Sequence, residues 1–214
     1  MFLLVRFLSF LVRILPEFIL RMICWALGNV LYSIPSKRRI VLSNLAHVYP
    51  DLREPELKKL TRKNCKLTIE MGLFALASPK YDTETIKKHL KFGKDFEKNY
   101  REVAGDNPML ILLPHNYLNE LVIFTPNLLG LPAKKAAAIF RPMDNPKLDD
   151  YIKQTRERGG LKLLSRRGGL ESAIGHLRAC GHLAILADQS AGDSGILGRV
   201  AGRTASLSPF PDLL

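Results

Sequence analysis

Three apolar segments in the second half of the chain each run into a residue that can carry charge. The segments are 109–113, 136–140 and 183–187, and the residues that follow them are His115, Arg141 and Asp188. Segments of this length, separated by stretches with helical periodicity, predict βαβ units and hence a largely parallel sheet flanked by helices. Because open parallel sheets bind ligands at the carboxyl ends of their strands, we expect a site at that edge.

The chain divides by composition into three segments. We expect a membrane-anchoring helical segment over 1–36, a helical lead-in over 37–107 and an α/β core over 108–214. Within the core, the patterns predict strands and helices in alternation, with strands at 109–113, 136–140, 161–164 and 183–187 and helices at 119–129, 146–158 and 170–180.

The first 34 residues are very apolar, but they include four charged residues. If they form one continuous helix, these residues share a narrow stripe; they are Arg6, Arg13, Glu17 and Arg21. Such a helix can lie at a membrane interface with its cations toward the head groups. Spanning stays open, although the charge-free run 22–36 is shorter than the ~20 residues that a bilayer usually needs. A helix packed on a soluble core is the third interpretation.

The chain carries a net charge of +12 and has a pI of about 9.8, which predicts an anionic partner. Nucleic acid, an anionic membrane surface, a phosphorylated lipid or an acidic carrier protein would fit. The apolar N-terminus and the lack of aromatic–basic clusters on the strands disfavour nucleic acid. The three cysteines form no CxxC pair, and no His/Cys spacing is typical of a metal site, so we expect no metal and no disulfide framework.

His115 and Glu120 form a His-x4-Glu pair. On one continuous helix they would lie about 140° apart, so they meet only if His115 occupies the turn before the helix. Glu120 would then accept a hydrogen bond from one imidazole nitrogen, and the other nitrogen could remove a proton from an alcohol. An ordinary surface histidine is the alternative interpretation.

Arginines also gather at this predicted edge. Arg141 follows one strand, and Arg166 and Arg167 follow the next, which favours an anion site. A salt bridge from Arg141 to Asp144 or Asp149 is an equal alternative. For Asp188 we favour a structural role, either capping loop amides or pairing with an arginine.

Four ordered segments carry a family resemblance: RRIVLSNLAHVYP, LLPHNYLNE, FRPMDNPKLDDYI and RRGGLESAIGHLRACGHLAILADQSAG. With this order and spacing the chain resembles the lipid A biosynthesis (lauroyl/myristoyl) acyltransferases, within the lysophospholipid acyltransferase superfamily. The resemblance implies transfer of a fatty acyl chain from acyl-acyl carrier protein, or acyl-CoA, to a hydroxyl of a phosphorylated lipid A precursor or related glycolipid. It implies no cofactor, and it implies a location at the cytoplasmic face of the inner membrane, among anionic membrane lipids.

The resemblance also implies roles for individual residues. His115 would be the general base and Glu120 its orienting partner. Arg141 would contact phosphate or position the acyl donor. Asp188 and Gln189 would match an aspartate–glutamine pair that supports the site.

Three departures from the family pattern bear on activity. Tyr117-Leu118-Asn119 stands where members often carry Gly-Asn-Trp, Ser190 stands where many carry an acid, and the chain stops at Leu214, where members continue. We expect the short end to leave an unpaired strand edge and an incomplete acyl pocket. A truncated, inactive membrane-bound remnant is therefore one alternative function, and an acyltransferase acting on a lysophospholipid is another.

Overall fold

The structure is a computed structural model that describes residues 2–105, 107–115, 119–132 and 134–214. By packing, the chain falls into two compact units. A helical unit comprises residues 3–80 with 201–203, and an α/β unit comprises residue 2, 81–200 and 204–214. The segment boundaries expected after residues 36 and 107 stay a prediction.

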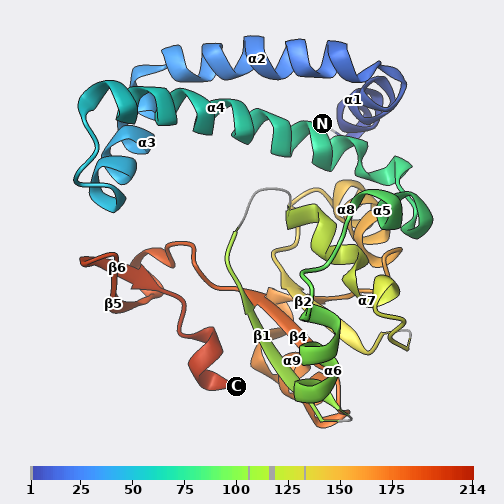
Figure 1. The fold of residues 1–214 in the computed structure, drawn as a ribbon. Helices are drawn as coiled ribbons and strands as arrows, with labels where there is room; N and C mark the ends of the chain where they lie inside the picture. The colour runs from blue at the N-terminus through green and yellow to red at the C-terminus, as the bar shows by residue number, and fades with distance from the viewer. Residues whose placement is uncertain (1, 106, 116–118, 133) are drawn as a thin grey trace. The chain divides into compact units, whose positions relative to one another are not determined.

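Four helices build the helical unit: α1 (Phe2–Ile14), α2 (Glu17–Ser33), α3 (Pro35–Val48) and α4 (Glu54–Ala77) (Figure 1). The single continuous helix considered for the first 34 residues is wrong, because the chain breaks at Pro16, which directly precedes α2. Proline has no amide hydrogen for the helix ladder, and its ring clashes with the preceding turn. The expected stripe is thus divided between two helices.

Close packing holds these helices together. Gly28 is buried on α2, and a Cβ atom there would stand 2.6 Å from Lys66 Cγ and 2.8 Å from Lys66 Cα on α4. Glycine therefore lets the two helix backbones approach. The Ser9 hydroxyl, also buried, donates a hydrogen bond of 2.6 Å to the Leu76 carbonyl and ties α1 to α4.

Within the described ranges, no single helix is both long and apolar enough to cross a bilayer. Helices α2 and α3 reach that length and apolarity only together, and they meet at a bend of 90°. The membrane anchor expected over 1–36 stays a prediction.

A four-stranded parallel sheet forms the centre of the α/β unit, which confirms the predicted fold class. The strand order is β1–β4–β2–β3, with bounds β1 (Met109–Leu113), β2 (Ala136–Phe140), β3 (Lys162–Ser165) and β4 (His182–Leu186). The first two strands have the predicted bounds, and the other two differ from them by one residue at each end.

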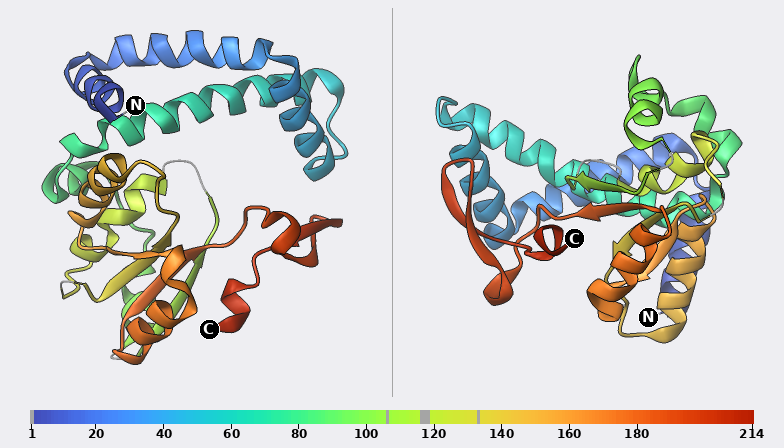
Figure 2. Two further views of the ribbon diagram at one scale, coloured as in Figure 1. Left: turned by 180° about the vertical axis from the view of Figure 1, so that it is seen from behind. Right: turned by 90° about the horizontal axis from the view of Figure 1, so that it is seen from below.

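The two faces of the sheet are covered by different segments. On one face, Ala138 and Ala184 pack with Ile86 of α5 (Thr83–His89) and with Phe124. On the other face, Ala137 and the neighbouring strand residues pack against α9 (Gly169–Arg178). The right-hand view of Figure 2 shows α9 on one side of the sheet. Both faces are apolar, as expected for a parallel sheet covered on both sides.

The segment predicted as one helix over 119–129 is instead a 3-10 helix, η2 (Asn119–Phe124), followed by the single turn α7 (Thr125–Leu128). Pro126 explains the break, since it lacks the amide hydrogen that a continuous helix would need there. Helix α8 (Pro146–Glu157) matches its prediction closely. Its N-cap is Asn145, whose side chain accepts a hydrogen bond of 3.1 Å from the Leu148 amide.

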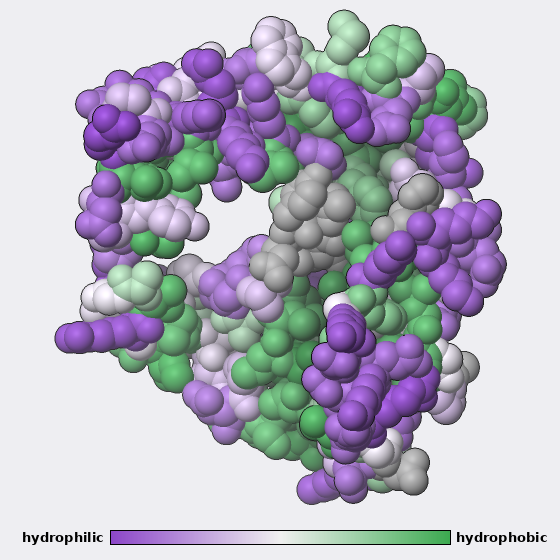
Figure 3. All heavy atoms as spheres, in the orientation of Figure 1, coloured by the Kyte–Doolittle hydropathy of each residue, from purple (hydrophilic) through white to green (hydrophobic). Residues whose placement is uncertain are grey.

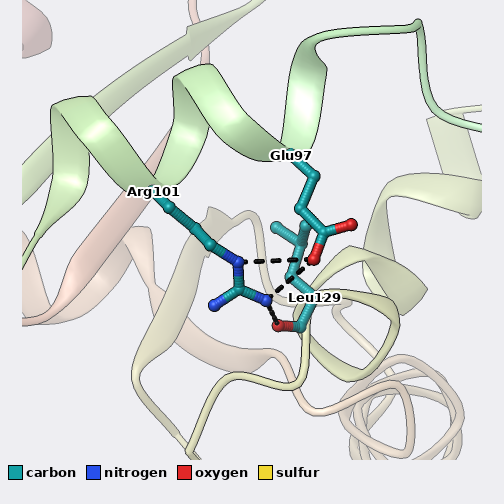
Figure 4. Close-up of polar contacts among 3 residues, drawn as sticks. All are labelled: Glu97, Arg101 and Leu129. Atoms are coloured by element: carbon teal, nitrogen blue, oxygen red, sulfur yellow. Dashed lines mark hydrogen bonds and ion pairs between the residues drawn. The ribbon is translucent and has the colours of Figure 1, made fainter.

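Within the α/β unit, Arg101 ties helix α6 (Phe96–Ala104) to the turn after α7. The guanidinium donates to Glu97 on its own helix at 2.9 Å and to the Leu129 carbonyl after α7 at 2.8 Å (Figure 4). Beyond the sheet, β5 (Ile196–Val200) and β6 (Arg203–Leu207) pair as a separate two-stranded sheet.

Candidate active site

The strand order brings His115 and Asp188 to the same place. Strands β1 and β4 are parallel neighbours in a register that pairs Met109 with His182 and Leu113 with Leu186, an offset of 73 residues. His115 and Asp188 keep that offset two residues beyond the last paired positions. They therefore emerge side by side at the carboxyl edge, where ligand sites of such sheets lie.

Two contacts join the pair. The backbone amide of His115 donates a hydrogen bond of 2.7 Å to Asp188 Oδ2, and its Nδ1 lies in hydrogen-bond contact with Asp188 Oδ1. Burial would raise the pKa of the Asp188 carboxyl, but the hydrogen bonds and charge of His115 outweigh it and hold the pKa below its ordinary value. An ionised carboxylate at Nδ1 holds the proton on that nitrogen and leaves Nε2 as the acceptor.

Glu120 has a different partner. Arg156, near the end of α8, donates from Nε to Glu120 Oε2 at 3.2 Å and contacts Glu120 Oε1 through Nη2. The guanidinium thus binds the carboxylate with two nitrogens, which is the strongest geometry for such a pair. Among the described contacts, His115 is joined to Asp188 and Glu120 to Arg156, and the expected His115–Glu120 hydrogen bond is not present.

The predicted arginines lie at the carboxyl edge. Arg141 follows β2 directly and is exposed, and Arg166 follows β3 and is also exposed. Since Phe140 pairs with Ser165, the two arginines leave neighbouring strands at the same level. The backbone of Arg167 continues the 3-10 turn η3 (Arg166–Gly168), but its side chain lies outside what the structure describes.

The turn after Arg141 is held by a carboxylate. Asp149 Oδ1 accepts a hydrogen bond of 2.7 Å from the Met143 amide, and in the described part of the chain it forms no ion pair with Arg141. Gln189 follows Asp188 and is exposed, as is Ser190, whose hydroxyl accepts from the Gly192 amide at 3.3 Å. Of the departures from the family pattern, Tyr117 and Leu118 fall outside the described residues.

Sequence reasoning missed Arg156 and assigned Asp188 a structural role. The Arg156–Glu120 contact spans 36 residues and depends on how α8 packs against η2, for which a single sequence carries no direct signal. The Asp188–His115 contact depends on β4 lying beside β1, which sequence order alone does not indicate. Within the described residues, no group of three His, Cys, Asp or Glu side chains could hold a metal ion.

Comparison with known proteins assigns the chain to a family. No curated protein gave a match to it. The family model described as "Bacterial lipid A biosynthesis acyltransferase" matches residues 1–205 of the 214. That match covers the helical unit, the four-stranded parallel sheet and the paired His115 and Asp188. The chain therefore belongs to the bacterial lipid A biosynthesis acyltransferase family.

Proposed function

We propose that this chain is an O-acyltransferase that moves a fatty acyl group from acyl-acyl carrier protein to a hydroxyl of a lipid A precursor or a related phosphorylated glycolipid. The observation that carries the proposal is the contact between His115 and Asp188 at the carboxyl edge of the sheet, in a chain that belongs to this acyltransferase family.

In this proposal His115 is the general base. Asp188 keeps a proton on Nδ1, so Nε2 accepts the proton of the acceptor hydroxyl as the oxygen attacks the thioester carbonyl. A C–O bond forms and, as the tetrahedral intermediate collapses, the C–S bond breaks. The imidazolium returns the proton to the departing thiolate, so no covalent enzyme intermediate is needed.

The surrounding cations bind the anionic substrates. Arg141 and Arg166, together with Arg167, supply guanidinium groups for the acceptor phosphate or the donor phosphopantetheine. Glu120, held by Arg156, acts by fixing η2 against α8 rather than by direct contact with the base. The net charge of +12 complements acyl carrier protein and anionic lipids at the cytoplasmic face of the inner membrane.

The test is transfer of labelled acyl groups from acyl carrier protein to an under-acylated lipid A precursor, with the full chain in membranes. We expect activity in the wild type, loss of at least roughly a hundredfold in His115→Ala, and little change in His47→Ala, a histidine outside the candidate site. Circular dichroism confirms that each variant is folded.

Two results would contradict the proposal. Transfer to lysophosphatidate, but not to the lipid A precursor, would move the chain to the lysophospholipid class. Absence of transfer from folded protein, while a longer family member is active in the same assay, would identify an inactive remnant.

A further inference from the structure

A pocket of about 450 Å³ lies within the helical unit, where α2, α3 and α4 meet. Its lining comes from all three helices: Tyr32, Arg38, Leu42, Lys58 and Thr61. All of these residues belong to the unit 3–80, whereas the candidate catalytic residues belong to the α/β unit. The pocket is therefore built independently of the acyl-transfer site.

Two guanidinium groups converge on the aromatic ring that lines this pocket. Arg38 Cζ lies 5.5 Å from the centroid of the Tyr32 ring, and Arg62 Cζ lies 4.8 Å from the same centroid. Both distances fall within the range of a cation–π contact. The ring thus orients the planar forks of two arginines, which is the group best suited to bind a phosphate through two nitrogens.

The pocket has more positive than negative charge. Lys58 is paired with Glu54 at 2.6 Å, a contact that raises the pKa of Lys58. In the described part of the chain, Arg38 and Arg62 have no carboxylate partner. Both guanidinium groups lie against the Tyr32 ring, and Arg38 also acts electrostatically on Lys58, so cations gather here and a bound anion offsets their mutual repulsion. Because Arg38 and Arg62 have no carboxylate partner within the described residues, they favour an anionic ligand.

An exposed side of α2 indicates the source of that anion. Phe18, Met22 and Trp25 are 64%, 65% and 63% exposed, and their spacing puts them on one side of the helix. Figure 3 shows apolar atoms at the upper right, over α1 and the adjoining end of α2. Tyr32 follows Trp25 by seven residues, close to two full turns, and therefore lies near the same side.

Cations of α4 run beside these aromatic side chains. Lys66 Nζ lies 5.8 Å from the centroid of the Trp25 ring, one helical turn along α4 from Arg62. Tryptophan and tyrosine next to lysine and arginine are typical of the level of lipid head groups, where the rings meet the apolar boundary and the cations meet phosphates. An exposed apolar strip that leads into a cationic pocket fits a lipid better than it fits a free anion.

We propose that this pocket binds the phosphate of an anionic membrane phospholipid. The principal ligands would be Arg38 of the lining and Arg62, which lies against the lining ring of Tyr32, with the exposed side of α2 against the acyl chains. The site uses none of the candidate catalytic residues, so the proposal stands whether or not the chain transfers acyl groups.

The test is flotation of the full chain with phosphatidylcholine vesicles, with and without phosphatidic acid. The quantity measured is the ratio of the two affinities. Arg38→Lys/Arg62→Lys keeps the net charge but removes the planar forks. Arg38→Gln/Arg62→Gln removes two charges, and Lys59→Gln/Lys63→Gln removes two exposed charges of α4 that do not line the pocket. Circular dichroism checks the fold of each variant.

We expect Arg38→Lys/Arg62→Lys to lower the preference for phosphatidic acid about tenfold, and Arg38→Gln/Arg62→Gln to lower it by at least as much. Lys59→Gln/Lys63→Gln should lower it less than about threefold. If the lysine variant keeps the wild-type preference for phosphatidic acid, the vesicles are attracted by the overall positive charge and not by the guanidinium groups, and the proposal fails. Because the lysine variant keeps both charges, its preference tests the proposal even if the glutamine variant does not fold.

A second arm separates the sources of phosphate. Inorganic phosphate is titrated into the protein in neutral detergent at constant ionic strength. We expect no saturable heat from inorganic phosphate in the wild type. Saturable heat that Arg38→Lys/Arg62→Lys abolishes, without any change in vesicle preference, would assign the pocket to a soluble phosphate and overturn the lipid assignment.

Discussion

Arg156 holds the carboxylate of Glu120 through two guanidinium nitrogens, across 36 residues of chain. The contact joins α8 to η2, the segment that follows His115. Through this contact Glu120, the acid of the His-x4-Glu pair, is paired with the Arg156 cation and not with His115. His115 takes its carboxylate partner from β4 instead, in the form of Asp188. Asp188 therefore contacts the candidate base, whereas Glu120 contacts Arg156, and replacing each acid in turn should have a different effect.

Replacement of Asp188 should impair the chemical step more than replacement of Glu120. Asp188→Asn retains an acceptor for the His115 amide but places an amide group beside Nδ1, which favours the wrong tautomer. We expect kcat to fall by about 10²–10⁴-fold, as for other histidine bases that lose their carboxylate. Glu120→Gln should lower kcat by less. The measurement is steady-state transfer with saturating donor, and equal losses in the two variants would contradict the assignment.

Glu120 and Arg156 should be coupled energetically. Their side chains are 18% and 32% exposed, and the contact uses both carboxylate oxygens, so it should exceed an ordinary surface pair. In a double-mutant cycle of Glu120→Gln and Arg156→Gln, we expect a coupling of about 1–2 kcal/mol from urea unfolding. Arg156→Lys should recover only part of it, because lysine lacks the fork. Additive single effects would show that the contact contributes nothing.

Gly159→Ala should disturb the segment that carries Glu120. A Cβ atom at Gly159, just after α8, would overlap the Ile123 carbonyl oxygen of η2 and stand 2.6 Å from its carbon. We expect a loss of about 1–3 kcal/mol in the free energy of unfolding, together with reduced transfer.

Gly175→Ala is the matched control for that change. Gly175 lies within α9, and a Cβ atom there would meet nothing within 4 Å. Because alanine favours a helix interior by up to about 1 kcal/mol over glycine, this variant should be neutral or more stable. Thermal unfolding of the two variants side by side measures the difference, and a similar loss in both would remove the steric explanation.

Acidification should reveal the Asp188 contact as a difference in stability. In the folded chain the pKa of the Asp188 carboxyl lies below its ordinary value. Burial is the largest single effect and raises this pKa, but the hydrogen bonds to His115 and its charge together lower it by more. The stability that it contributes is therefore fully present above the unfolded pKa of about 3.9 and is lost as the pH falls through the folded pKa. Since Asp188 is 41% exposed, solvent screening limits the effect to roughly 0.5 kcal/mol.

The corresponding measurement is the urea midpoint of the wild type and of Asp188→Asn over a pH series. The wild-type advantage should be constant near neutral pH and disappear below about pH 3. An advantage that persists unchanged into strong acid would mean that the carboxylate charge does not stabilise the fold.

The strands and helices of the α/β unit could largely be predicted from the sequence, but the hydrogen-bond partners of the site residues could not. Strands such as 109–113 are recognisable from a short apolar run before a polar turn, and the gathering of His115, Arg141 and Asp188 at one edge follows from parallel strands. Which of these residues touch depends on β4 lying between β1 and β2. That order comes from long-range packing of the sheet, and local patterns do not encode it.

Two prolines mark the places where the predicted helices differ from the observed ones. Pro16 and Pro126 each interrupt an apolar stretch that composition alone assigns to one helix, and each lies at or next to the start of a new one. In contrast, the aromatic–cation cluster around Tyr32 could not be predicted from the sequence, because it joins three helices. Two of them, α2 and α4, approach closely at Gly28, and a local pattern does not encode that contact.

The shared offset of β1 and β4 has an evolutionary consequence. One residue, Pro114, separates the last paired position of β1 from His115, and one residue, Ala187, separates β4 from Asp188. Substitutions at these two linkers leave the spacing intact, whereas a single-residue insertion or deletion in either would move one member of the pair out of step. In descendants of this chain, a change of side chain at either position therefore keeps the pair in step, whereas a change of length does so only if both linkers change together.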